Sequence, residues 1–211
     1  MVLTGPEIQR LVAVGDIVID PFNPKQLNPN SYNLRLADTL LVYEPGAVSH
    51  RRFAQQEEYT RKYWPPTEPG PSPYVRPLDM AKEEPTTEIK IPTEGLVLWP
   101  GILYLAATIE RTGSPKHRPT IDGRSSAGRL GLWVHMTAGY GDVGFGHPNA
   151  CTWTLELAVV QPLRVYAGAE ICQITFATIQ GDIQLYDGRY NSQSEGKPQP
   201  SKLWKEFQSP Q

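Results

Sequence analysis

Short runs of apolar and β-branched residues, each ended by proline, glycine, asparagine or aspartate, cover most of this 211-residue chain, which holds 21 prolines and 18 glycines. Such runs are typical of β-strands separated by turns. Strands are predicted over 17–19, 31–36, 39–43, 88–91, 103–109, 132–136, 152–160, 163–166, 171–179 and 183–186. One helix is predicted at the start, where Thr4 caps a segment with helical apolar spacing that ends at Gly15. The pattern favours an all-β sandwich or barrel.

A proline-rich segment, 51–92, interrupts this pattern. Its prolines stand among charged and aromatic residues, and they include Pro65, Pro66, Pro69, Pro71, Pro73, Pro77 and Pro85. Proline is excluded from central strands because it lacks the N–H that the ladder needs. We therefore predict an insertion in extended conformation, on the surface or against a neighbouring subunit, with disorder as the alternative. The polar tail 191–211 contains Trp204 and Phe207, which predict that it docks.

The charge balance argues against duplex nucleic acid as a partner. The chain has 20 Lys and Arg against 22 Asp and Glu, a net charge of −2, so it has no overall basic field. The longest apolar stretch, 96–109, contains Pro100-Gly101 and falls short of the roughly 20 unbroken residues of a membrane helix. The first residues lack the features of a signal peptide. We expect a cytoplasmic protein without a membrane span, in which Cys151 and Cys172 are buried thiols.

The segment 122–132 carries the clearest pattern for anion binding. Arg124 and Arg129 flank Ser125 and Ser126 within a glycine-rich sequence. Guanidinium and hydroxyl groups donate hydrogen bonds to phosphate oxygens, and glycine lets the backbone approach closely. The spacing matches neither a Walker A loop nor a dinucleotide fingerprint. Composition leaves two interpretations open, a phosphate-binding turn and an ordinary Gly-Ser turn with solvated arginines.

Glu156 is the one charged residue in the apolar run 152–160. Burial would raise its pKa and suit it to proton transfer near neutral pH. The alternative is a glutamate on the solvent face of an amphipathic strand. Before this run, the glycine-dense turn 135–145 holds a single carboxylate, Asp142.

The sequence excludes some well-known hydrolytic sites. A zinc nucleoside deaminase needs a His-x-Glu element and a Pro-Cys-x-x-Cys element, and the chain has neither. A Gly-x-Ser-x-Gly elbow is also absent. The histidines are scattered without ligand spacing, at His50, His117, His135 and His147. Hydrolysis by this chain would therefore use a carboxylate and water, with Mg²⁺ bound through the phosphates of a substrate.

Taken together, these motifs resemble the dCTP deaminases of the dUTPase superfamily, and especially the bifunctional branch that also cleaves dUTP. The segment 28–36, Asn-Pro-Asn-Ser-Tyr-Asn-Leu-Arg-Leu, is similar to the family's Ser-Tyr-Asp-Leu-Arg-Leu strand. The central motifs are 123–131, 137–140, Asp142, 144–145 and 154–156. The later ones are Gly168, Gln173, 190–193, Gly196, Pro198, 200–202 and Trp204. Because several spaced motifs follow the family's order, the match is specific.

The resemblance implies an all-β fold with a short N-terminal helix, a distorted β-barrel or jelly roll of the dUTPase-like type. It implies one domain over 1–211, with the insertion at about 51–92 and a tail at about 187–211 that closes over the nucleotide. It also implies a homotrimer with active sites shared between subunits, acting on dCTP and dUTP, with dTTP as a candidate inhibitor.

The resemblance also assigns roles to single residues. Glu156 would be the general base and acid that removes the amino group from C4 of cytosine without zinc. Asp142 would bind the 3′-hydroxyl and position water for attack on the α-phosphorus. Ser125 and Arg129 would complete the catalytic set, Arg129 by reaching towards the base, with the adjacent subunit as one source. The other substrate contacts would be Arg124, Ser126, Ala127, Gly128, Thr154, Leu155, Gln173, Tyr186, Arg189 and Gln193. No residue is expected to ligate a metal, since Mg²⁺ would arrive with the triphosphate.

The segment 137–140, Thr-Ala-Gly-Tyr, favours the bifunctional branch, because deaminases that release dUTP tend to have His-Arg after Thr-Ala. The predicted reaction converts dCTP to dUMP, ammonia and pyrophosphate. Three alternatives remain: a deaminase that releases dUTP, a dUTPase alone, and a non-catalytic nucleotide-binding trimer.

Three features depart from the family pattern. Gly141 stands where the family has Ile, and Arg189 where a Lys is usual. The loop 146–150 lengthens the stretch between Asp142 and Glu156. Because this loop is expected next to the base, a modified cytosine stays open as the substrate.

Overall fold

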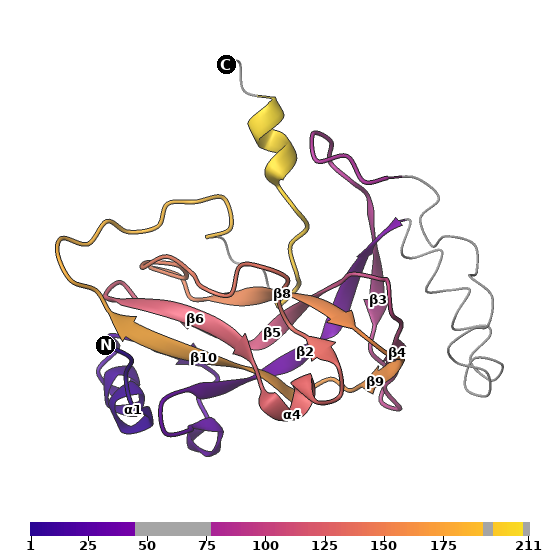
Figure 1. Cartoon of the computed structure of the whole chain (residues 1–211). Coiled ribbons are helices and arrows are strands. Elements are labelled where there is room, and N and C mark those ends of the chain that lie inside the picture. Colours follow the sequence, from indigo (N-terminus) through magenta and orange to yellow (C-terminus); the bar gives the residue numbers. More distant parts are fainter. Residues whose placement is uncertain (45–76, 192–195, 209–211) are drawn as a thin grey trace.

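The computed structural model of the chain describes residues 1–44, 77–191 and 196–208. It is built mainly of antiparallel strands, with a short helix near the N-terminus (Figure 1). In chain order its elements are α1 (Gly5–Ala13), β1 (Val18–Asp20), η1 (Pro24–Gln26), β2 (Tyr32–Tyr43), β3 (Thr86–Lys90), β4 (Leu96–Leu98), β5 (Tyr104–Gly113), β6 (His117–Gly123), α4 (Ser125–Gly128), β7 (Leu132–Trp133), β8 (Cys151–Val159), β9 (Leu163–Val165), β10 (Glu170–Thr178) and η2 (Leu203–Phe207).

Helix α1 confirms the prediction for the start of the chain. The Oγ1 atom of Thr4 accepts a hydrogen bond from the backbone N–H of Glu7, which is the capping arrangement that the spacing predicts. Ile8 and Leu11 lie on the buried face of the helix and join the core. Across the described residues, no helix is long and apolar enough to cross a bilayer.

Most of the predicted runs are strands, with three differences. The runs 31–36 and 39–43 form one strand, β2, and the run 132–136 is a strand only over β7. The run 183–186 is not a strand, and Ile183 and Leu185 lie exposed. Strands β4 and β6 were not predicted, and β6 contains Pro119. Proline is tolerated in β6 because, in the part of the chain that the structure describes, this strand pairs with only one full strand, β10.

The main sheet has the order β6-β10-β2-β5-β8-β7, with β1 paired to β5 and β3 to β2, while β4 and β9 form a separate pair. The segment after β7 returns to β6, so that the two ends of the sheet approach each other. Tyr140 forms a bridge with Thr120, and the backbone N–H of Gly141 donates to the carbonyl of Pro119 at 3.0 Å. The sheet is therefore a nearly closed barrel, which confirms the predicted fold class.

The proline-rich segment contributes one strand within its described part. β3 pairs with the second half of β2 and, among the described strands, with no other, so it lies at an edge of the described sheet. This position agrees with the exclusion of the segment from central strands. The remainder of the predicted insertion, 51–76, lies outside the described residues.

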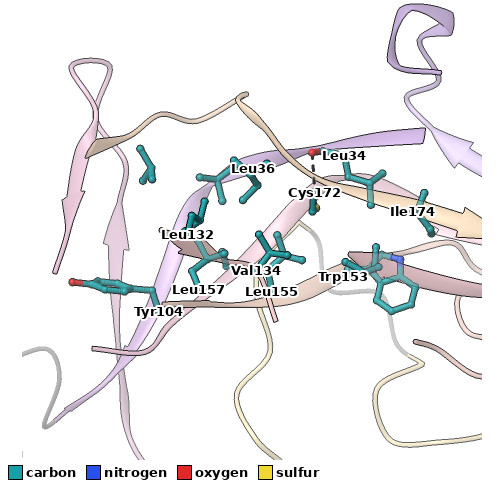
Figure 2. Close-up of a cluster of buried hydrophobic side chains, with 14 of the residues drawn as sticks. Leu34, Leu36, Tyr104, Leu132, Val134, Trp153, Leu155, Leu157, Cys172 and Ile174 are labelled. Carbon is teal, nitrogen blue, oxygen red and sulfur yellow. Dashed lines mark hydrogen bonds between the residues drawn. The ribbon is translucent and has the colours of Figure 1, made fainter. Parts of the chain in front are cut away.

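The core lies inside the barrel, and β8 shows how the sequence builds it. Trp153, Leu155 and Leu157 are buried, while Thr154 and Glu156 between them face the other side of the sheet. Figure 2 shows the first three gathered with side chains from β2, β7 and β10. Cys151 and Cys172 are free and buried, as predicted, and burial raises the pKa of Cys151 to about 11.

Candidate active site

Glu156 lies half-buried on the face of β8 that points away from the core. Its backbone N–H donates to the carbonyl of Val134 at 3.0 Å. Its Oε2 atom accepts a hydrogen bond of 2.7 Å from the backbone N–H of Met136. Among the described residues, the Oε1 atom has no hydrogen-bond partner. One carboxylate oxygen is thus fixed, and the other is available to a ligand.

A cavity of about 360 Å³ opens beside Glu156. Its wall is made by β8, by Tyr43 at the end of β2, by Phe145 and by the chain after residue 189, where Tyr190 and Pro200 contribute. This volume falls at the small end of the range for ligand pockets, which is about 300–1,000 Å³. Glu156 therefore faces a space of the size that a small ligand needs.

Residues 199–201 of the tail line this cavity. The backbone of the tail passes beside β8 (Figure 1). Side-chain oxygens of the cavity wall accept hydrogen bonds from backbone N–H groups of the tail. Gln199 donates to Oγ1 of Thr154 at 2.9 Å, and Ser201 donates to the hydroxyl of Tyr43 at 3.0 Å. A third bond of 2.8 Å joins the N–H of Lys202 to the hydroxyl of Tyr190. We call residues 199–202 the strap. The strap contacts the barrel through these backbone bonds, whereas Phe207, one of the two aromatic residues on which the docking prediction rested, is exposed.

Asp142 lies exposed in the loop between β7 and β8 and does not line the cavity. Gly141, the residue before it, stands where the family has Ile, and its surroundings explain this departure. A Cβ atom on Gly141 would lie 2.7 Å from the ring of Trp153 and 3.2 Å from Pro119. The indole of Trp153 therefore occupies the space that an isoleucine side chain would need at position 141.

The arginine-serine segment forms α4 and its flanks. Arg124 is the N-cap, Ser125 and Ser126 begin the turn with their side chains exposed, and Arg129 is the exposed C-cap. Arg124 forms an ion pair with Glu170, with 3.1 Å between Nη1 and Oε2. The hydroxyls and the Arg129 guanidinium point to solvent and are accessible to an anion.

In one chain, α4 and Glu156 belong to different parts of the surface. The carbonyl of Gly131, just after α4, accepts a hydrogen bond from the N–H of Val160, which follows the end of β8 and lies four residues beyond Glu156. Four residues of strand span about 13 Å. The cavity beside Glu156 is lined by no residue of α4. The predicted phosphate contacts and the predicted deaminating carboxylate therefore do not converge on one cavity within the chain.

The remaining predicted substrate contacts are engaged within the chain to different degrees. Both ends of the Gln173 amide are bonded, Oε1 to Ser31 and Nε2 to the carbonyl of Gly123. Arg189 pairs with Glu206 at 2.9 Å and donates to the carbonyl of Lys202. The side chain of Leu155 is buried in the core, so only its backbone is available. Tyr186 packs against Phe145, and Gln193 lies outside the described residues.

Sequence reasoning missed the groups that hold these residues in place. Tertiary contacts position three such groups, and no local sequence pattern predicts them. They are the N–H of Met136, the hydroxyl of Tyr43 and the carboxylate of Glu170. In the described ranges, no three His, Cys, Asp or Glu residues are placed to hold a metal ion.

Comparison with known proteins places the chain in a family. A family model described as dCTP deaminase-like matches residues 2–179. A protein of Leptospira biflexa is 46% identical over 99% of both chains, and one of Hathewaya histolytica is 44% identical over 99% of this chain and 100% of its own. A third, from Cytophaga hutchinsonii, is 44% identical over 99% of both. All three are named dCTP deaminase, dUMP-forming.

A solved structure supports the same assignment at the level of the fold. The 2′-deoxycytidine 5′-triphosphate deaminase from Agrobacterium tumefaciens matches with a TM-score of 0.52 and 18% identity, over 83% of this chain and 47% of that chain. The predicted family is confirmed, and the chain belongs to the dCTP deaminase-like family.

Proposed function

We propose that this protein deaminates dCTP at C4 of cytosine and cleaves the triphosphate, releasing dUMP, pyrophosphate and ammonia. The observation that carries the proposal is the Glu156 carboxylate, half-buried beside a cavity with Oε2 held by Met136 and Oε1 open to a ligand. The three relatives named dCTP deaminase, dUMP-forming, support the same reaction and the branch that 137–140 favours.

Deamination needs a group that takes a proton from water and later gives it to the departing amine. Oε1 of Glu156, which has no partner among the described residues, would accept this proton while the attacking oxygen bonds to C4 and the C4=N3 electron pair moves to N3. The same carboxylate would then give its proton to the amino group, the electron pair on N3 would re-form the double bond to C4 as the C4–N bond to the amine breaks, and ammonia would leave. Transfer of the remaining hydroxyl proton to N3 gives the C4 carbonyl of uracil. Because the Met136 N–H fixes Oε2, the carboxylate keeps one orientation through both steps. No protein-bound zinc enters this proposal.

Cleavage of the triphosphate would use the side chains of α4 and of its two caps. Arg124, Arg129 and the hydroxyls of Ser125 and Ser126 would bind phosphate oxygens, with Mg²⁺ bound to the nucleotide adding positive charge. Asp142 would position the water that attacks the α-phosphorus, and pyrophosphate would leave. Competition by dTTP for this turn belongs to the same proposal, because dTTP carries the same triphosphate.

The separation of these groups within one chain supports a site that is shared between subunits. The cavity at Glu156 contains no residue of α4, and Asp142 is exposed. We therefore propose a homotrimer in which the α4 turn of one subunit completes the cavity of its neighbour. Light scattering on the active protein tests this arrangement, and a fully active monomer would contradict it.

The deciding experiment incubates the protein and Mg²⁺ with dCTP and, separately, with dUTP. Nucleotides are followed by ion-exchange chromatography and ammonia by a coupled assay. Formation of dUMP from both substrates supports the proposal. Accumulation of dUTP from dCTP would indicate a deaminase alone, and conversion of dUTP only would indicate a dUTPase. Binding of nucleotide without turnover would indicate a non-catalytic trimer.

A further inference from the structure

We propose that Glu170 is a positioning residue for the phosphate-binding guanidinium of Arg124, a role that rests on the proposed function of the α4 turn. Glu170 is the first residue of β10 and is half-buried. It was not among the predicted site residues, and nothing in its local sequence distinguishes it. Its importance comes from two contacts with the side chain of Arg124, one made by its carboxylate and the other by its backbone carbonyl.

A single nitrogen of the guanidinium is tied down by this residue. Nη1 of Arg124 lies 3.1 Å from the carboxylate Oε2 of Glu170 and donates to its backbone carbonyl at 3.0 Å. Within the described part of the chain, Nε and Nη2 of Arg124 have no partner. Nε and Nη2 form the side edge of the fork, which binds two oxygens of a phosphate at once. Glu170 thus fixes Nη1 of Arg124 and leaves the edge formed by Nε and Nη2 available to a ligand.

The Glu170 carboxylate is itself held by the neighbouring strand. Nδ2 of Asn33 donates to Oε2 of Glu170 at 2.8 Å, and Oδ1 of Asn33 accepts from Asn28 at 2.8 Å. The backbone N–H of Arg124 also donates to the carbonyl of Ile171 at 3.3 Å. Both the main chain and the side chain of the arginine are therefore attached to the start of β10. A side chain with this much support loses little rotamer freedom when it binds.

The charge of Glu170 allows two opposite predictions. A carboxylate beside a phosphate site repels the phosphate, so on Coulombic grounds its neutralisation would tighten binding. If instead the carboxylate orients the guanidinium, its neutralisation weakens phosphate binding, because the Nε and Nη2 edge of Arg124 is no longer held in one orientation. The support from Asn33 and the double contact on Nη1 favour orientation as the larger effect. The sign of the change in affinity separates the two.

The test measures binding of inorganic tripolyphosphate with Mg²⁺, by calorimetry and as a competitive inhibitor of dCTP turnover. The variants are Glu170→Gln, Arg124→Gln and the double variant, with Glu7→Gln as the control that removes the same charge from an exposed ion pair on α1. We expect Glu170→Gln to weaken tripolyphosphate binding by about tenfold, the size of one charge-assisted hydrogen bond. We expect the KM for dCTP to rise by a similar factor while kcat changes little, and Glu7→Gln to leave both unchanged.

The double variant tests whether Glu170 acts through Arg124. In the Arg124→Gln background, Glu170→Gln should weaken tripolyphosphate binding by less than about twofold. Glu170→Asp provides a second measurement that does not depend on the folding of the glutamine variant. It keeps the charge but shortens the reach, so it should also weaken binding.

The outcomes separate this proposal from the one on which it rests. If Arg124→Gln leaves tripolyphosphate binding unchanged, the phosphate-binding function of α4 is wrong. If Arg124→Gln weakens binding but Glu170→Gln and Glu170→Asp bind as the unaltered protein does, only the role of Glu170 is wrong. Tighter binding by Glu170→Gln would also overturn that role, and it would identify the carboxylate as a repulsive charge.

Discussion

The Oε2 atom of Glu156 accepts a 2.7 Å hydrogen bond from the backbone N–H of Met136, so the chain after β7 orients the carboxylate that β8 carries. A backbone donor cannot be removed by a change of side chain, and it fixes the carboxylate against the strand. The site can therefore be tested at Glu156 itself without altering the element that holds it.

Glu156→Gln should abolish deamination and preserve the fold. The amide cannot take a proton from water, so ammonia release from dCTP should fall by about a hundredfold or more. Cleavage of dUTP should continue, because its proposed residues lie on α4 and at Asp142. Both rates are measured on one preparation, so dUTP cleavage serves as the internal control. Ammonia release at the rate of the unaltered protein would remove Glu156 from the mechanism.

Tyr43→Phe should loosen the strap. It removes the hydroxyl that accepts from the Ser201 N–H, a hydrogen bond worth about 1 kcal/mol. We expect the KM for dCTP to rise about fivefold and limited proteolysis to cut the chain near residue 200 faster. Tyr166→Phe is the matched control for proteolysis, since Tyr166 is exposed and does not line the cavity that the strap covers. Equal proteolysis of the two variants would argue against a latch at Tyr43.

Gly141→Ala should destabilise the protein. The new Cβ atom would lie 2.7 Å from the Trp153 ring, and such overpacking costs about 1–3 kcal/mol. Urea denaturation measures the free energy of unfolding. Gly128→Ala is the control for stability, because nothing lies within 4 Å of the Cβ that it adds. A loss of stability in Gly128→Ala as large as in Gly141→Ala would contradict the packing argument.

Arg35→Met should be among the most destabilising single changes. Nε of Arg35 lies 2.6 Å from Oε1 of Glu110, whose side chain is fully buried. Removal of the arginine leaves a buried carboxylate without its cation, which costs about 3–5 kcal/mol. The free energy of unfolding in urea gives the result. Arg10→Met breaks an exposed ion pair on α1 and should leave the midpoint unchanged.

His117 should make the protein less stable in mild acid. Burial lowers the pKa of this imidazole below its usual 6.5, and the charge of Lys116 lowers it further, while Asp16 and Glu7 act in the opposite direction. The unfolded chain then binds more protons than the folded one, so stability rises with pH. The contribution of His117 is complete above about pH 6.5 and is lost as the pH falls below that value. His117→Gln should reduce the drop in unfolding free energy between pH 7 and pH 5, and an equal drop in both proteins would contradict this assignment.

The fold could be predicted where local pattern and tertiary structure agree. The alternation in 152–160 and the capping at Thr4 led directly to β8 and α1. The prediction failed where a tertiary contact decides, as at Pro119, which is tolerated because β6 has one full partner strand. It also failed at 183–186, where the apolar residues have no strand beside them among the described residues.

The candidate site was predictable in its residue types but not in its geometry. Glu156 was identifiable as a charge in an apolar strand, and its position beside a cavity agrees with a role beyond a plain solvent face. The hydrogen bonds that define the site come from the Met136 backbone, Tyr43 and Glu170, which are distant in sequence from the groups they hold. Such contacts depend on register and strand length, and a single sequence does not reveal them.

The single strand β2 reaches both regions of the proposed chemistry. Asn33 near its beginning supports Glu170, and Tyr43 at its end lines the cavity of Glu156. Loss of one residue inside β2 would turn every later side chain to the opposite face. A residue gained or lost inside β2 would therefore leave Asn33 beside Glu170 but turn Tyr43 away from the cavity, so the two regions depend together on the length of this one strand.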